Sequence, residues 1–91
     1  MRYIVCYDVA DDGRRSRLSD CLKDFGPRVQ ESVFIADLDD ELIKRMRERI
    51  DAIVDSHLDA VHIFVQCRAC AMRTEIHGIA QVPKDETFYI L

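Results

Sequence analysis

The sequence contains no tryptophan, only three glycines and only two prolines among its 91 residues. Together with 48% hydrophobic residues, this composition indicates a folded globular chain and excludes a disordered one. No segment approaches the roughly 20 consecutive apolar residues that a membrane-spanning helix needs. The apolar run from Tyr3 is too short for a secretory signal, and it ends at Asp8. We therefore expect a cytoplasmic protein with no membrane partner.

Positive charge is not in excess, because 13 Lys and Arg stand against 17 Asp and Glu, for a formal net charge of −4. This balance excludes nucleic-acid binding through overall charge, but it permits a local basic patch, since the field near a surface depends on how its charges are distributed. No glycine-rich phosphate loop and no internal repeat are present. Without a secretory signal, we interpret the cysteines as reduced thiols. They are Cys6, Cys21, Cys67 and Cys70.

The length of the chain fits a single domain, residues 1–91. A domain of this size buries only roughly 60–65% of the surface of its unfolded chain. Its isolated fold is therefore marginally stable, and we expect it to associate with a second copy.

The strands are predicted from apolar and β-branched runs. Residues 2–9 form a strand that is apolar on both faces, which is typical of a central strand covered above and below. Residues 28–38 predict a short strand, a tight turn or bulge, and a longer strand. Residues 60–66 predict a further strand, and the segments 74–79 and 87–91 are also strand-like.

Two helices are predicted between these strands from apolar residues spaced three and four apart. Asp11 or Asp12 caps the first helix, and Gly26-Pro27 ends it. Asp39 or Asp40 caps the second. Their apolar stripes are Leu18, Cys21, Leu22 and Phe25 in the first helix, and Ile43, Met46, Ile50 and Ile53 in the second.

The resulting order, β-α-β-β-α-β, predicts an α+β ferredoxin-like sandwich with two helices on one face of a sheet. We expect an extra C-terminal strand within about residues 73–91, paired either within its own chain or with a neighbouring one. The helices leave one sheet face open, although the first strand is apolar on both faces. A homodimer formed through the open sheet face, by a two-fold contact, would cover it.

Asp8 ends the first predicted strand. An aspartate at a strand end commonly accepts hydrogen bonds from turn amides, which would make it structural. It could instead bind Mg²⁺ or Mn²⁺, because Mg²⁺ keeps several waters and needs only one or two protein carboxylates. A single Asp8 is a poor site, but a two-fold axis near the strand end would bring two together around one shared ion.

Three arginines, Arg14, Arg15 and Arg17, stand at the start of the first helix, where the macrodipole disfavours cations. One interpretation is a solvated helix face paired with nearby aspartates, each pair contributing about 0–1 kcal/mol. The other is a nucleic-acid-binding surface, because helix N-termini and arginine forks both bind phosphate. Arg28 could add to the same surface.

The remaining candidates have mainly structural interpretations. The pair Cys67 and Cys70 lacks the four ligands of a structural zinc site, so we expect a turn holding two half-buried thiols. A soft-metal carrier that uses this pair is the weakest alternative for function. Ser32 has no general base near it in the sequence and is interpreted as a turn residue. Tyr7 and Phe34 are expected to pack in the core.

Two blocks of sequence resemble a known family. The motif YDV…RR.R…L…G.RVQ.SVF…L, from Tyr7 to Leu38, is similar to the small CRISPR-associated protein of the universal spacer-acquisition pair. The block VHIFVQCRAC…G…P, from Val61 to Pro83, resembles the fourth strand, cysteine pair and C-terminal extension of that family. The resemblance implies a metal-dependent endonuclease on RNA or DNA. It also implies a homodimer that bridges the larger CRISPR integrase. A non-catalytic nucleic-acid-binding scaffold is the alternative.

The resemblance also implies roles for individual residues. Asp8 matches a metal-binding aspartate that faces its copy across the dimer axis and holds one Mg²⁺, and Tyr7 matches the tyrosine beside it in the catalytic site. Phe34 and Ser32 belong to the SVF block and would have supporting roles. The positions that match nucleic-acid-contacting or site-supporting basic residues are Arg15, Arg17 and Arg28.

Overall fold

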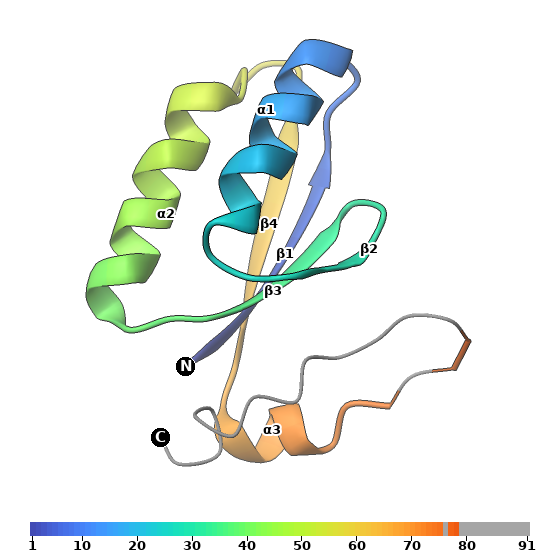
Figure 1. Ribbon diagram of the computed structural model, residues 1–91, viewed down its shortest axis with the longest axis vertical. Helices are drawn as coiled ribbons and strands as arrows, with labels where there is room; N and C mark the ends of the chain where they lie inside the picture. Colours follow the sequence, from blue (N-terminus) through green and yellow to red (C-terminus); the bar gives the residue numbers. More distant parts are fainter. Residues whose placement is uncertain (76, 79–91) are drawn as a thin grey trace.

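The computed structural model describes residues 1–75, 77 and 78 (Figure 1). Within them, the predicted order of strands and helices is confirmed, and one short helix, α3, is added. None of the helices in these residues is long and apolar enough to cross a membrane. The elements are β1 (Arg2–Asp8), α1 (Asp12–Lys23), β2 (Arg28–Gln30), β3 (Val33–Asp37), α2 (Asp40–Ile53), β4 (Ala60–Gln66) and α3 (Arg68–Met72).

The four strands form one sheet in the order β2-β3-β1-β4. The central strand, β1, is antiparallel to both of its neighbours, with Val5 opposite Phe34 in β3 and Asp8 opposite Ala60 in β4. A register shift between Arg28 and Gln30 confirms the expected irregularity between β2 and β3. This arrangement is the predicted ferredoxin-like α+β fold.

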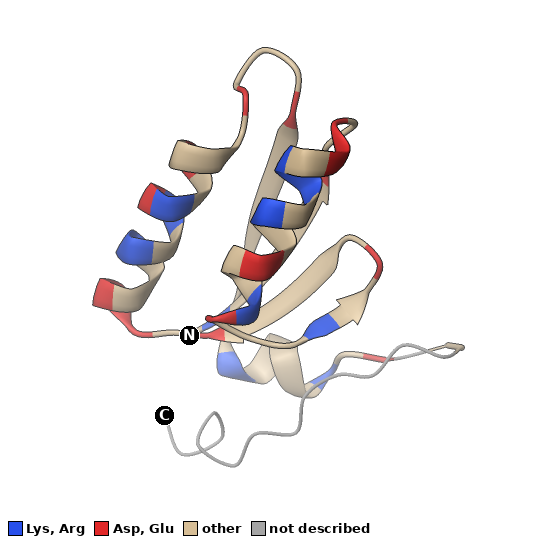
Figure 2. Cartoon of the chain, turned by 45° about the horizontal axis from the view of Figure 1, so that its top comes forward, with Lys and Arg blue, Asp and Glu red and all other residues tan. Residues whose placement is uncertain are grey.

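The hydrophobic core lies between the sheet and the two long helices, which cover the same sheet face (Figure 1). From β1, this face receives Tyr3, Val5 and Tyr7, all buried. The predicted stripes are confirmed, except that Phe25 lies after the end of α1. Phe25 and Ile53, the last residue of α2, are only partly buried against the core. The buried stripe residues are Leu18, Cys21, Leu22, Ile43, Met46 and Ile50. Charged residues of both signs occupy many of the other positions along the helices (Figure 2).

Single residues determine where the two long helices start and how the chain turns after α1. The Asp11 carboxylate accepts the Arg14 amide at 2.8 Å and caps α1, while Asp39 accepts the Leu42 amide at 2.8 Å and caps α2. These contacts settle which of each aspartate pair is the cap. Gly26, after α1, passes so close to β3 that an added Cβ would lie 2.1 Å from a backbone carbonyl oxygen. Only glycine fits there, and its position lets the chain turn into β2.

The sheet face opposite α1 and α2 carries exposed apolar groups, as expected. Ile4 and Cys6 are half-buried there, and Phe64 is 54% exposed. The rings of His62 and Phe64 stack with their centroids 6.1 Å apart. Strand β1 is not wholly apolar, because it also contains the buried Arg2. The Arg2 guanidinium pairs with Asp37 in β3 at 2.8 and 3.0 Å.

The expectation of half-buried thiols after β4 is wrong. Cys67 and Cys70 are both exposed, because the chain forms the single-turn helix α3 at the surface, with the Cys67 side chain as its cap. The described residues between 73 and 78 form no strand. Residues 87–91, and most of the C-terminal strand predicted within 73–91, lie outside the described residues.

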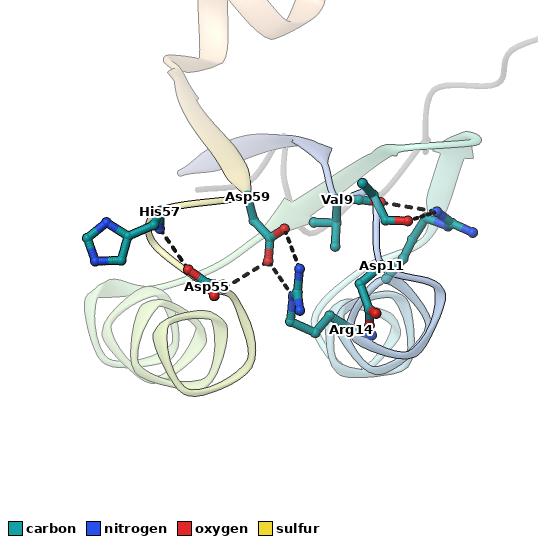
Figure 3. Close-up of polar contacts among 8 residues, drawn as sticks. Val9, Asp11, Arg14, Asp55, His57 and Asp59 are labelled. Atoms are coloured by element: carbon teal, nitrogen blue, oxygen red, sulfur yellow. Dashed lines mark hydrogen bonds and ion pairs between the residues drawn. The ribbon is translucent and has the colours of Figure 1, made fainter.

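A partly buried ion pair joins the start of α1 to the start of β4 (Figure 3). Arg14 donates from Nε and Nη2 to the two carboxylate oxygens of Asp59, at 2.8 and 3.2 Å. The Asp55 amide also donates to Asp59 at 2.8 Å, and the Asp59 side chain is fully inaccessible to solvent. The hydrogen bonds from Arg14 and from the Asp55 amide lower the pKa of Asp59, and the bond to Asp59 raises the pKa of Arg14.

We predict that Asp59→Asn lowers the thermal unfolding midpoint at pH 7 by several degrees, because it leaves the guanidinium without its carboxylate. The pKa of Asp59 is lower in the folded chain, so its stabilisation is present above about pH 4 and is lost as the pH falls through the folded pKa. Circular dichroism melts between pH 7 and pH 2 should therefore converge for the parent protein and the variant at low pH. Asp51→Asn, at an exposed position of α2, is the control. Parallel pH profiles for parent and Asp59→Asn would contradict the prediction.

Candidate functional site

Asp8 is the last residue of β1, and its side chain is exposed. Because side chains alternate along a strand, it lies on the opposite face from buried Tyr7 and on the same open face as Ile4 and Cys6. No hydrogen bond to the Asp8 carboxylate is found among the residues that the structure describes. The turn-amide contacts expected of a structural aspartate are therefore not formed there, and its oxygens are available to a ligand.

One copy of the chain supplies a single carboxylate at this position. Within the described residues, no three His, Cys, Asp or Glu side chains gather closely enough to hold a metal ion. Hard divalent cations prefer oxygen ligands, and the Asp8 carboxylate provides them. A complete site would therefore need further ligands from water or from another chain.

Arg15 fixes the loop that follows Asp8. Its Nη1 donates to the carbonyl oxygens of Val9 at 3.1 Å and Ala10 at 3.4 Å, and its Nη2 pairs with Asp12. The guanidinium thus bonds to the backbone on one side and to a carboxylate on the other. These contacts restrict the chain between β1 and α1, and they hold the end of β1 in place.

Tyr7 is held on the helix side of the sheet. Its hydroxyl donates to the Glu31 carbonyl at 3.4 Å, and its amide donates to the Ser32 carbonyl at 3.1 Å. Its ring stacks against Phe34, with centroids 6.2 Å apart. The structure therefore brings Tyr7, Ser32 and Phe34 together, with the last two supporting the first, but it places this group across the sheet from Asp8.

A groove of about 330 Å³ lies between α1 and the β2–β3 hairpin. Tyr7, Arg15 and Arg28 line it, so two of the predicted basic residues share one surface. Arg28 is exposed, and its side chain has no hydrogen bond or ion pair within the described part of the chain. The other lining residues, of mixed charge, are Asp12, Ser16, Ser19, Asp20, Lys23 and Glu31.

The three arginines at the start of α1 do not converge on one point. Arg14 is bound to Asp59, and Arg15 holds the loop. Arg17 follows Arg15 by two positions, about 200° around the helix, so it lies on a different flank of α1 from the groove. It is exposed and has no ion pair among the described residues. Arg17 and Arg28 are therefore the arginines of this set with guanidinium groups available to a phosphate.

Sequence reasoning missed Asp59, which is the partner of Arg14. The aspartates considered as partners were neighbours in the sequence, whereas Asp59 is 45 residues away. Its position directly before a predicted strand was a signal, because that strand pairs with β1 and brings the two loops together.

The chain is similar to known proteins along most of its length. The family model described as CRISPR associated protein Cas2 matches residues 1–74. CRISPR-associated endoribonuclease Cas2 4 of Rhodospirillum rubrum is 36% identical over 99% of this chain and 73% of its own length. CRISPR-associated endonuclease Cas2 2 of Thermus thermophilus is 38% identical over 90% of this chain and 87% of its own length.

Solved structures agree with this sequence similarity. The crystal structure of a hypothetical protein from Thermus thermophilus has a TM-score of 0.80 and 37% identity, covering 91% of this chain and 96% of that one. The crystal structure of Streptococcus pyogenes Cas2 at pH 6.5 has a TM-score of 0.77 and 25% identity, covering 86% of this chain and all of that one. With the family model matched over residues 1–74 and these relatives, the chain belongs to the CRISPR associated protein Cas2 family.

Proposed function

We propose that this protein is a CRISPR spacer-acquisition protein of the cytoplasm and a metal-dependent endonuclease that hydrolyses phosphodiester bonds in RNA or DNA. The observation that carries the proposal is the exposed Asp8 carboxylate, which has no hydrogen-bond partner among the described residues. The names of two relatives support the reaction, since one is called an endoribonuclease and the other an endonuclease.

The active form is a homodimer joined through the open sheet faces. Association would bury Ile4 and the ring of Phe64, which is 54% exposed in the single chain. Burial of apolar surface stabilises the dimer by roughly 25 cal/mol per Å², and the Phe64 ring would supply much of the buried apolar area. A two-fold axis near the end of β1 would bring the two Asp8 carboxylates together on this face.

The Asp8 pair would hold one Mg²⁺ or Mn²⁺. Two carboxylates repel each other when nothing lies between them, so the pair favours a cation or a proton. The oxygen donors fit Mg²⁺, which when bound polarises a phosphate and activates water. Arg15 would act as a positioning residue, because it holds the Val9 and Ala10 carbonyls directly after Asp8.

Nucleic acid would be bound through exposed arginines, of which Arg17 and Arg28 have free guanidinium groups among the described residues. Such side chains contact phosphates without reading bases, and they bind sequences with similar strength. Arg14 and Arg15 also belong to the basic start of α1, but their intramolecular bonds make them supports of the surface.

A bridging scaffold for the larger CRISPR integrase is the second candidate function. It is favoured by the separation of the two groups of residues, since the groove with Arg28 lies on the helix side of the sheet, whereas Asp8 lies on the open face. In this function the arginines would grip DNA without cleavage at Asp8. A soft-metal carrier gains no support, because Cys67 and Cys70 find no third ligand among the described residues.

We predict that Asp8→Asn reduces Mg²⁺-dependent cleavage of RNA or DNA by about 100-fold or more, because the amide removes the negative charge that binds the cation. The change preserves the shape of the side chain at an exposed strand end, so the thermal midpoint and the dimer should be retained. Cleavage rates would be measured on purified protein with and without the integrase partner.

Asp51→Asn is the matched control, because it removes the same charge from an exposed position of α2 and should leave cleavage unchanged. Equal cleavage by the parent protein and Asp8→Asn would refute the assigned site. Binding of nucleic acid with no cleavage by either protein would favour the scaffold function.

We also predict that Arg17→Gln and Arg28→Gln each weaken nucleic-acid binding by a similar factor for all sequences. Each should reduce the slope of log affinity against log salt by about 1, as expected for the loss of one phosphate contact. Fluorescence anisotropy between low and moderate salt would measure both effects. Arg68→Gln, outside the start of α1 and the groove, is a control of equal charge change. An unchanged salt slope in both variants would exclude these contacts.

A further inference from the structure

A pair of exposed thiols follows β4, and the proposed nuclease function does not use it. Cys67 precedes the single-turn helix α3, and Cys70 lies within it. Both side chains are exposed, whereas Cys21 is buried in the core and Cys6 is half-buried on the sheet. Of the four thiols, these two are therefore the ones most accessible to a reagent in solution.

The two cysteines lie on one side of the same turn. The Cys67 Sγ accepts a hydrogen bond from the Cys70 amide at 3.4 Å, so the first sulfur already lies against the backbone of the second residue. Residues three apart in an α-helix have Cα atoms about 5 Å apart, and a disulfide requires a Cα separation of roughly 4.4–6.8 Å. Rotation of the two side chains is then enough to join the sulfurs without moving the sheet.

We propose that Cys67 and Cys70 form a reversible dithiol–disulfide site that exchanges with small-molecule disulfides of the glutathione type. The Cys67 thiolate attacks one sulfur of glutathione disulfide, forming a mixed disulfide and releasing one glutathione thiolate, which takes up the proton that Cys67 lost. Cys70 then loses its proton and attacks the Cys67 sulfur, and the second glutathione leaves as a thiol. Two electrons pass from the protein pair to the glutathione disulfide.

The surroundings of the two sulfurs indicate which cysteine attacks the glutathione disulfide and which one resolves the mixed disulfide. The backbone hydrogen bond from Cys70 lowers the pKa of Cys67, and the side-chain hydrogen bond with Cys67 raises the pKa of Cys70. A lower pKa gives more of the thiolate that attacks a disulfide, so Cys67 is the attacking residue and Cys70 the resolving one. Burial raises the pKa of Cys21, which makes it a slow-reacting reference within the same chain.

The site is remote from the candidate nuclease centre. In the register of β1 and β4, Asp8 is opposite Ala60, whereas Arg2 is opposite Gln66, the residue directly before Cys67. The thiols therefore lie at the far end of β4 from Asp8, roughly 20 Å away at about 3.4 Å per residue. Substitution of either cysteine should leave Mg²⁺-dependent cleavage unchanged, so the two proposals can fail independently.

The test is incubation of the full chain with glutathione disulfide, followed by mass spectrometry of the intact protein and its peptides. The parent protein should lose two hydrogens, with the new bond mapped to Cys67 and Cys70, and reduced glutathione should reverse the change. Cys70→Ser lacks the resolving thiol, so it should retain one glutathione on Cys67. Cys67→Ser cannot form the intramolecular disulfide, so a glutathione that it acquires should remain on Cys70.

Cys21→Ser is the matched control, because it removes a buried thiol and should still form the same disulfide. Cys67 and Cys70 that remain reduced at every ratio of oxidised to reduced glutathione would overturn the proposal. A stoichiometric Zn²⁺ complex of the reduced protein that needs both sulfurs and blocks oxidation would also overturn it, in favour of a metal site. Circular dichroism of each variant would show that its fold is retained.

Discussion

The rest of the structure depends on the hydrogen bonding of β1 to strands on both of its sides. With β3 and β4 as antiparallel neighbours, β1 cannot slip without turning Tyr3, Val5 and Tyr7 out of the core. The same register fixes Asp8 on the open face at the end of the strand. The alternation of side chains along β1 thus separates a buried face, covered by the helices, from an open face that carries Asp8.

The unusual arginines at the start of α1 are explained largely by this strand end. Arg14 bonds to Asp59 before β4, and Arg15 bonds to the carbonyls after β1, so both hold the loops that flank Asp8. Their local partners offset the unfavourable position of cations near a helix N-terminus. In the proposed function, rigid support of this kind would matter for Asp8, because small displacements of a catalytic group reduce its effect strongly. In the proposed function, phosphate binding would fall to exposed arginines such as Arg17.

Features that depend on local sequence could be predicted, and features that depend on distant contacts could not. The apolar stripes of α1 and α2 follow from residue spacing, and the choice of cap was narrowed to two adjacent aspartates in each case, of which Asp11 and Asp39 are correct. The Arg14–Asp59 pair joins residues 45 positions apart, and the only signal for it was the place of Asp59 directly before a strand whose pairing with β1 became clear from the structure. The prediction that Cys67 and Cys70 are half-buried was wrong, because α3 has only five residues and is too short for its periodicity to be seen in the sequence. Asp8 was identified as a candidate, but its placement on the open face required the strand register.

The central claim is that one cation is shared by two Asp8 residues, and the stoichiometry of Mn²⁺ binding tests it most directly. Isothermal titration of the purified protein, with sedimentation measured on the same sample, would give the number of ions per chain and the oligomeric state. The shared site predicts a dimer that binds one ion for every two chains, and loss of that ion in Asp8→Asn. A monomer, one ion per chain, or equal binding by Asp8→Asn would contradict it.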